Sequence, residues 1–325
     1  MVRVEFKEVG QGDSIVLEWT NSEGVSCFGL VDCNQKNGFN PSLDFVKSNT
    51  HKSFEFIILS HFHEDHYSGL ADIFEYCTAN KIRVKVFYHT MGEFLSDFYN
   101  RIDTTKRTEN AYERFFTTFE EFDCESERIS IRTMPISLTK DVKLSFLSPT
   151  GNVYDKFAKQ LARKRNKVVT TQADVNKLAT IIIVEGNTSC FLLTSDAVKS
   201  SFSRIRGQVQ KKVKLLQAPH HGSFPNVDPF FWNQLNLENG SPAVFSVGES
   251  PKDKLPNIET VVFFSNLGLQ VCATNEVYGI AEFQKKTRST TSEVESMMNI
   301  FSTVVGSTEV RSTPYSGNQI FRVQI

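Results

Sequence analysis

Apolar and charged residues alternate at the start of the chain, and this alternation predicts two β-strands separated by a turn. Residues 2–9 place valine and phenylalanine between charged residues, and residues 14–20 carry an apolar run of similar length. A period of two is the period of side chains along a half-buried strand. Gly10-Gln11-Gly12-Asp13 lies between the two runs and predicts the turn.

Longer apolar runs predict buried strands, and helical spacing appears between them. Cys27–Asp32 and Phe54–Ser60 are nearly continuous apolar runs, whereas Leu70, Ile73, Phe74 and Cys77 recur at the spacing of a helix. The strands fall into two groups with helices between them. We therefore expect an α/β fold in which two mixed β-sheets pack together under outer helices, an αββα sandwich. Further strands are expected at 83–89, 129–134, 142–147, 180–185, 189–194, 213–217, 243–248, 269–274, 279–283 and 319–325.

The chain is expected to form one main domain with an insert and a tail. Residues 93–128 look helical and strongly charged, which predicts a helical insert. After about residue 286 the composition becomes polar and rich in serine and threonine. We therefore assign residues 1–285 to the main domain and residues 286–325 to a C-terminal extension of unknown role.

Composition limits the class of protein. There are 36 basic and 37 acidic side chains among 325 residues, and 40% of the residues are hydrophobic, which are globular proportions. The net charge of -1 argues against a protein that coats nucleic acid or a membrane non-specifically. The six cysteines form no CxxC pair, and neither a signal peptide nor a membrane-spanning run is evident. We expect free thiols and a cytoplasmic protein without membrane contact.

Three of the seven histidines crowd into His61-Phe62-His63-Glu64-Asp65-His66, directly after a predicted strand and before a predicted helix. Imidazole and carboxylate groups are the usual ligands of zinc and of similar divalent ions. A turn between two elements can direct closely spaced ligands to different places. We expect His61 and His63 to face one metal ion, and Asp65 and His66 to face a second.

Two more strand ends carry residues of the same chemistry. Asp196 follows one predicted strand and His220-His221 follows another. Asp196 is well placed to bridge two ions. We favour His220 as the further ligand, with His221 as the alternative. Asp32 also ends a strand and is expected to orient a ligand histidine through a hydrogen bond. The predicted ligands are His61, His63, Asp65, His66, Asp196 and His220.

Two adjacent divalent ions would support hydrolysis. They lower the pKa of a shared water and stabilise charge at a phosphoryl or acyl centre. Asp65 is expected to accept a hydrogen bond from the resulting hydroxide, and His221 to donate a proton to the leaving group. Zn²⁺ fits this donor set best, and Mn²⁺ is the second choice.

The motifs, taken together and in order, resemble the metallo-β-lactamase superfamily. They begin with Val9-Gly10-Gln11-Gly12-Asp13-Ser14 and Leu30-Val31-Asp32, and continue through the histidine cluster to Gly69-Leu70. The likeness is to the ComEC-type branch, the hydrolase domain of bacterial DNA-uptake proteins, and covers about residues 1–284. It implies a hydrolase in residues 1–285. Further matching motifs are Leu192–Asp196, Pro219–Ser223, Ser246–Gly248, and Thr274 with Gly279.

The chain also departs from the pattern of this branch. His63 stands where the branch usually has aspartate, which enlarges the ligand set. The additional histidine of the first metal site is not evident; Asn176 stands nearby and is expected to act as a weak ligand or a supporting group, with His89 as another source of nitrogen. Where the branch typically has a His-Pro pair, this chain has Lys254-Leu255-Pro256, and Lys254 and Ser223 are candidate substrate-binding residues.

The resemblance and the basic runs at residues 156–167 and 204–214 favour a phosphodiesterase, most simply a nuclease acting on DNA or RNA. One alternative is a small-molecule phosphodiesterase acting on a cyclic nucleotide or a phosphocholine ester. Another is a non-enzymatic scaffold subunit, against which the retained ligands argue. Protein partners are left open.

Overall fold

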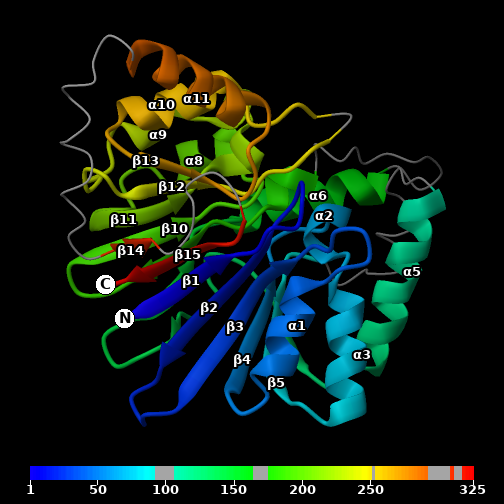
Figure 1. Ribbon diagram of the computed structural model, residues 1–325. Helices are drawn as coiled ribbons and strands as arrows, with labels where there is room; N and C mark the ends of the chain where they lie inside the picture. Colours follow the sequence, from blue (N-terminus) through cyan, green and yellow to red (C-terminus); the bar gives the residue numbers. More distant parts are fainter. Residues whose placement is uncertain (92–105, 164–174, 251–252, 292–307, 311–316) are drawn as a thin grey trace.

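Two β-sheets pack face to face, and helices cover the outer face of each (Figure 1). The structure is a computed structural model that describes residues 1–91, 106–163, 175–250, 253–291, 308–310 and 317–325. Each sheet contains parallel and antiparallel strand pairs. The architecture confirms the αββα sandwich predicted from the sequence.

The first sheet has antiparallel strands on one side and parallel strands on the other. Alternation in the N-terminal strand places Val2, Val4 and Phe6 in the core between the sheets. The described strands, in spatial order, are β14 (Thr308–Val310), β15 (Gln319–Val323), β1 (Val2–Phe6), β2 (Ser14–Thr20), β3 (Ser26–Cys33), β4 (Ser53–Leu59), β5 (Val84–His89) and β6 (Glu125–Arg128). The pairs β3–β4, β4–β5 and β5–β6 are parallel.

The helices on the first sheet begin where the sequence provides capping residues and an apolar stripe. In α1 (Pro41–Ser48) the side chain of Asn40 accepts a hydrogen bond from the Leu43 N–H, and proline occupies the first turn. The predicted stripe is buried in α3 (Leu70–Asn80). The helix α5 (Lys106–Glu121) lies beside α3 (Figure 1) and belongs to the predicted insert, of which residues 93–105 lie outside the described residues.

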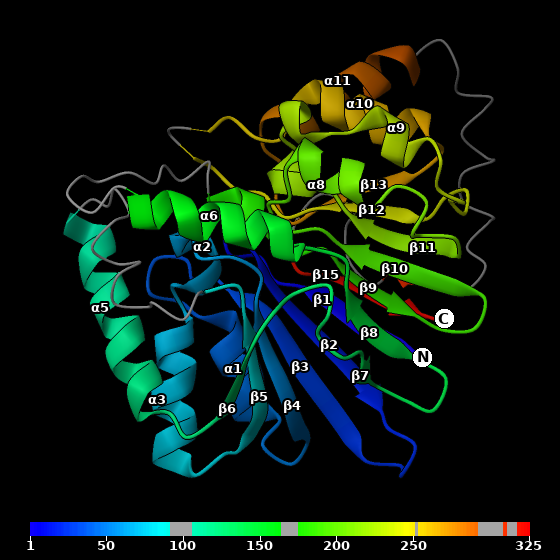
Figure 2. The same cartoon turned by 180° about the vertical axis from the view of Figure 1, so that it is seen from behind.

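The second sheet repeats the pattern, with a parallel group next to a hairpin. Its described strands, in spatial order, are β13 (Gln270–Ala273), β12 (Pro242–Phe245), β11 (Lys212–Gln217), β10 (Ser189–Leu193), β9 (Ile182–Glu185), β8 (Lys143–Phe146) and β7 (Ile136–Ser137). Its outer face is covered by α8 (Lys199–Arg204), α9 (Pro229–Trp232), α10 (Ile258–Asn266) and α11 (Tyr278–Thr291). A further helix, α6 (Gly151–Arg163), crosses the end of the sandwich next to α2 (Glu64–Tyr67), as Figure 2 shows.

Two of the predicted strands are wrong. Residues 279–283 lie in α11, because Ile280 is buried and Phe283 packs on the same core, a helical spacing that was mistaken for a strand. Residues 129–134 form a turn, and β6 ends at Arg128, because Ser130 and Thr133 pair with each other through short-range hydrogen bonds. Short apolar runs do not separate these alternatives by themselves.

The segment assigned to a C-terminal extension contributes to the sandwich. β15 pairs with β1, and Phe321 and Val323 are fully buried in the core between the sheets. Helix α11 also crosses the predicted boundary at residue 285. Among the described residues, no helix combines the length and the apolar character that a membrane crossing needs.

Candidate metal centre

The predicted site residues come together at one end of the sandwich. Asp32 lies at the end of β3, the histidine loop follows β4, Asp196 follows β10, and His220-His221 follows β11. The pairs β3–β4 and β10–β11 are parallel, so their carboxyl ends lie at the same edge of each sheet. Residues that follow such strand ends meet even when they are far apart in the sequence.

The histidine loop is held by an aromatic cluster that involves the insert. Phe62 stacks on Tyr67, with ring centroids 4.4 Å apart, and contacts Tyr112 of α5 at 4.7 Å and Phe115 at 5.3 Å. Phe62 is therefore buried in this aromatic cluster. Its sequence neighbours His61 and His63 point the other way, toward Asp196. The helix of the insert fixes the loop through packing.

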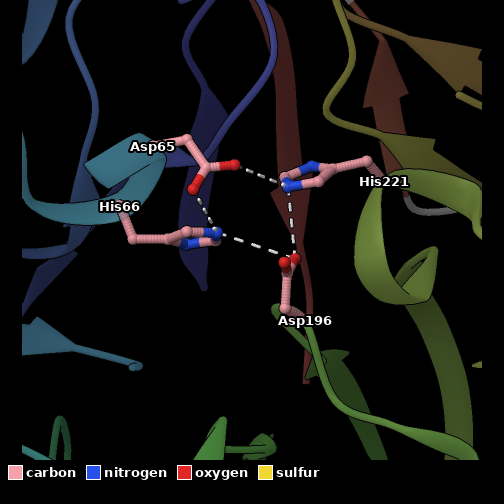
Figure 3. A group of neighbouring side chains, drawn as sticks. All are labelled: Asp65, His66, Asp196 and His221. Carbon is pink, nitrogen blue, oxygen red and sulfur yellow. Dashed lines mark ion pairs between the residues drawn. The ribbon is translucent and has the colours of Figure 1, made fainter. Parts of the chain in front are cut away.

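Four side chains form a closed ring, which Figure 3 shows. The His221 Nε2 atom lies 3.4 Å from Asp65 Oδ2 and 3.2 Å from Asp196 Oδ1. The His66 Nε2 atom lies 3.8 Å from Asp65 Oδ1 and 3.6 Å from Asp196 Oδ1. All four donor atoms lie within 4.8 Å of one another, so one cation can contact them together. We call Asp65, His66, Asp196 and His221 group 2.

A second set of donors shares Asp196. The His61 Nε2 and His63 Nδ1 atoms are 3.0 Å apart, and Asp196 Oδ2 lies 3.8 Å from His61 Nε2. The donor atoms of these three residues also lie within 4.8 Å of one another. We call His61, His63 and Asp196 group 1. The two oxygens of one buried carboxylate thus face two different sets of donors.

Three donor atoms of group 2 lack ordinary partners among the described residues. Within the described part of the chain, the Nε2 atoms of His66 and His221 and the Oδ1 atom of Asp196 are buried and have no hydrogen-bond partner. These three residues are at most 3% exposed. Leaving such groups unpaired costs about 1–3 kcal/mol each. A divalent cation between them would satisfy all of them, so the residues fit a metal ion.

The ligand histidines are oriented from behind by hydrogen bonds. Asp32 Oδ2 lies 2.7 Å from His66 Nδ1, and Asp32 also accepts hydrogen bonds from the backbone N–H and the hydroxyl of Ser60. His221 Nδ1 lies 2.9 Å from the Ser246 carbonyl oxygen, to which it donates its proton. Each contact leaves the Nε2 lone pair directed into the site, as in metal-bound histidines.

Asp13 and Gln217 also support the site, and they were not singled out from the sequence. Gln217 donates to Asp13 Oδ2 at 2.8 Å and accepts hydrogen bonds from the N–H groups of Thr194 and Ser195, directly before Asp196. The Asp13 N–H donates to the Asp65 carbonyl oxygen. In the sequence, only the turn motif around Asp13 was connected with the site. The link to Gln217 has no local signal, because the two residues are 204 positions apart.

The electric field at the histidines of group 2 favours positive charge. Burial lowers the pKa of His221, but Asp196, Asp65 and Asp13 outweigh burial and raise that pKa to about 10. Burial alone would also lower the pKa of His66. The carboxylates of Asp32, Asp65 and Asp196 outweigh burial and raise that pKa well above its usual value. The neighbouring histidines hold the pKa of Asp196 well below its usual value against the effect of burial. Protons here occupy the places that a divalent ion would take.

His220 lies on the side of group 1. Its Nε2 atom is 3.6 Å from Asp196 Oδ2, and its Nδ1 atom contacts the amides of Asn226 at 3.1 Å and Asn176 at 3.4 Å. Both His220 and His221 have positive φ, 48° and 51°, a rare conformation for residues with side chains. This backbone lets two consecutive imidazoles approach opposite oxygens of Asp196.

The remaining predicted residues lie at varying distances from the donors. A cavity of about 1140 Å³ opens over the donors, and Asn176 lines it, whereas neither Lys254 nor Ser223 is among its lining residues. His89 packs against Phe87 and Phe119 and belongs to no group of donors among the described residues. Of the basic run 156–167, residues 164–167 lie outside the described residues.

Comparisons with known proteins agree with this architecture. A sequence model of the metallo-beta-lactamase superfamily matches residues 51–153, which include the histidine loop, and supports membership of that superfamily. A search of curated proteins finds no match. The two-sheet sandwich with flanking helices is consistent with the fold of that superfamily.

Several solved structures are similar at low identity. They include a diphosphatase from the PhnP family (14% identity, 75% of this chain and 85% of that chain, TM-score 0.39). Zn²⁺-bound PqqB from Methylobacterium extorquens has 8% identity over 83% of this chain and 96% of that chain, with a TM-score of 0.43. A long form RNase Z from yeast has 13% identity over 79% of this chain and 38% of that chain, with a TM-score of 0.41. Similarity at this level does not bear on the reaction.

Proposed function

We propose that this protein is a metal-dependent phosphodiesterase in which groups 1 and 2 would each hold a divalent ion, with Asp196 serving both groups. The observation that carries the proposal is that the two Asp196 oxygens face different histidines. Oδ1 faces His66 and His221, and Oδ2 faces His61 and His220. A structural carboxylate would be paired by hydrogen-bond donors, yet Asp196 Oδ1 is buried without such a partner among the described residues.

The donor set indicates which ions fit. Nitrogen and carboxylate donors without thiolate suit Zn²⁺, and also Mn²⁺. Bound ions would lower the pKa of a coordinated water and stabilise the charge that develops on phosphoryl oxygens. The protein residues hold the geometry: Asp32 and the Ser246 carbonyl fix the rings of His66 and His221, and Gln217 holds the backbone before Asp196.

The contacts of His221 favour a ligand role over the proton-donor role suggested by the sequence. Its Nδ1 proton is used by the Ser246 carbonyl, and its Nε2 atom is buried inside group 2. We assign His220 to group 1, as the nitrogen that the missing histidine would have supplied. Turning the amides of both Asn176 and Asn226 would let their oxygens accept the His220 Nδ1 proton and leave Nε2 free for the ion. Among the described residues, Asn176 Oδ1 is buried without a hydrogen-bond partner.

Asp65 is the most exposed residue of group 2. It is about a third exposed, whereas Asp196 is almost completely buried, and it lines the cavity beside His63. An oxygen of Asp65 can therefore accept a hydrogen bond from the attacking water while the other remains near His66. We propose Asp65 as both a ligand and the residue that orients the nucleophile.

The test measures metal content and turnover on the same samples. The purified protein is freed of metal and loaded with Zn²⁺ or Mn²⁺. Its ions are counted by elemental analysis, and its hydrolysis of bis-p-nitrophenyl phosphate is followed with and without chelator. We expect two ions per chain and turnover that chelator abolishes. Absence of metal uptake would exclude the proposal, and two bound ions without turnover of any phosphodiester would favour the scaffold alternative.

A further inference from the structure

The cavity over the metal centre has an unusual lining for an enzyme that would hold nucleic acid. Amide side chains, which are neutral donors and acceptors of hydrogen bonds, are the most numerous polar type in it. The lining amides are those of Gln11, Asn34, Gln35, Asn37, Asn176 and Asn275. A polyanion is normally bound by lysine and arginine side chains along its path. Such basic side chains are scarce in the described lining.

The fixed charges of the lining are mostly negative. Five carboxylates line the cavity, those of Glu64, Asp65, Asp196, Glu249 and Asp253, together with a single lysine, Lys36. Lys36 Nζ lies 2.7 Å from Glu8 Oε1, so an ion pair already balances its charge. Two divalent ions would contribute four positive charges and bring the formal charge of these lining residues to zero. The ions are then the main attraction for an anionic group.

Glu249 and Asp253 are the acids of the lining that belong neither to the donor groups nor to the histidine loop. Both are exposed and lie on the segment that follows β12. At the donor end of the same cavity, Asn176 Oδ1 is buried without a hydrogen-bond partner in the described chain. A substrate in this cavity would therefore share its lining with a neutral amide near the donors and with these two carboxylates.

We propose, building on the phosphodiesterase activity proposed above, that the cavity selects small phosphodiesters that carry one negative charge and neutral hydrogen-bonding groups. The reacting phosphate is held at the metal centre, and sugar or base groups contact the amides. A second phosphate would lie among Glu249 and Asp253, whose repulsion disfavours it. Nucleic-acid polymers are accordingly poor substrates. Repulsion between charges roughly 10 Å apart lowers the rate constant by about three- to tenfold per added phosphate at low salt.

The experiment compares two substrates that differ by one phosphate. We use thymidine 5′-(p-nitrophenyl phosphate) and the same compound with a 3′-phosphate, together with oligothymidylate, on the metal-loaded protein at several salt concentrations. We expect kcat/KM to be about three- to tenfold lower for the doubly phosphorylated compound, and the difference to shrink as salt screens the charges. Preference for that compound or for the polymer, with rates that fall as salt rises, would overturn the inference.

Variants identify the residues responsible. Glu249→Gln with Asp253→Asn should bring the ratio of the two kcat/KM values toward one. The matched control, Glu23→Gln with Asp141→Asn, removes the same charge from exposed turns outside the cavity lining and should keep the ratio. An unchanged ratio in the cavity variant would reject the role of these acids. Loss of the proposed function is distinct, because then neither small substrate is hydrolysed by the metal-loaded protein.

Discussion

The two donor groups of the site share Asp196 but differ in how completely they are built. Group 2 combines two imidazoles and two carboxylates, and a buried acceptor holds each of its rings from behind. Group 1 brings His61, His63 and Asp196 within range of one another, and His220, which we propose as its further ligand, is about a quarter exposed. The difference suggests that ion affinity is set by the support behind each ligand as well as by the ligand count.

The supports of group 1 are also more readily rearranged. His61 Nδ1 lies near the hydroxyls of Ser60 and Ser195, and His220 Nδ1 near two asparagine amides. Hydroxyls and amides can turn to donate or accept, whereas a carboxylate or a carbonyl oxygen only accepts. We therefore expect the ion of group 2 to bind more tightly than the ion of group 1.

The largest effect is expected from removing the residue that the two groups share. Asp196→Ala should abolish binding of both ions and lower hydrolysis of bis-p-nitrophenyl phosphate on the order of a thousandfold, because each group loses its bridging oxygen. Elemental analysis and steady-state rates measure both effects. Asp141→Asn, on an exposed turn, serves as the control for handling and charge. Retention of one ion in Asp196→Ala would show that the groups are independent.

The next effect concerns the support of group 2. Asp32→Asn keeps the size of the side chain, and asparagine tolerates the positive φ of 57° at this position, so the fold should persist. The weaker acceptor should orient His66 less well and reduce affinity at group 2 by about 10–100-fold. Competition with a metal-sensitive dye measures the affinities. If Asp32→Asn instead weakened group 1 alone, the assignment of supports to groups would be wrong.

Much of the site could be predicted because metal ligands at strand ends leave a local signature. His61, His63, Asp65 and His66 stand in a single loop, and Asp196 and His220-His221 each follow an apolar strand. The αββα sandwich could be predicted because its strands appear in the sequence as two groups of apolar runs. These features depend on neighbours in the sequence, so periodicity and spacing reveal them.

What the sequence did not reveal depends on contacts between distant segments. The link from Gln217 to Asp13 joins the two sheets, and no local pattern marks it. The pairing of β15 with β1 was missed because a tail carries no sign of its partner strand. The separate positions of His220 and His221 depend on two consecutive positive φ angles. A positive φ is rare for residues other than glycine, so the sequence does not predict it here.

A smaller effect distinguishes group 1 from group 2. His220→Ala should lower the number of tightly bound ions from two to one and leave group 2 loaded, because His220 approaches only the Oδ2 side of Asp196. Asn176→Ala should weaken the same ion to a lesser extent. His51→Ala, which changes an exposed histidine outside the site, provides the control. Equal loss of both ions from His220→Ala would contradict the division into two groups.

The smallest effect on the site is expected at His89, which tests whether group 1 draws a nitrogen from β5. Burial, aided by the charge of Arg128, lowers the pKa of His89 to about 4, so the folded protein keeps this ring neutral. The unfolded chain takes up a proton near pH 6.5. The stability contributed by the neutral ring is therefore complete above about pH 6.5 and decreases as the pH falls from there toward 4, by up to about 3 kcal/mol.

His89→Phe should remove this part of the pH dependence and leave the ion count at two. Urea unfolding between pH 4 and pH 8, compared between wild type and variant, isolates the contribution, since the carboxylates that titrate over this range are common to both. Phenylalanine suits the surroundings, where Phe87 and Phe119 already contact the ring. Loss of one ion in His89→Phe would instead make His89 a ligand of group 1, in addition to His61, His63, Asp196 and the proposed ligand His220.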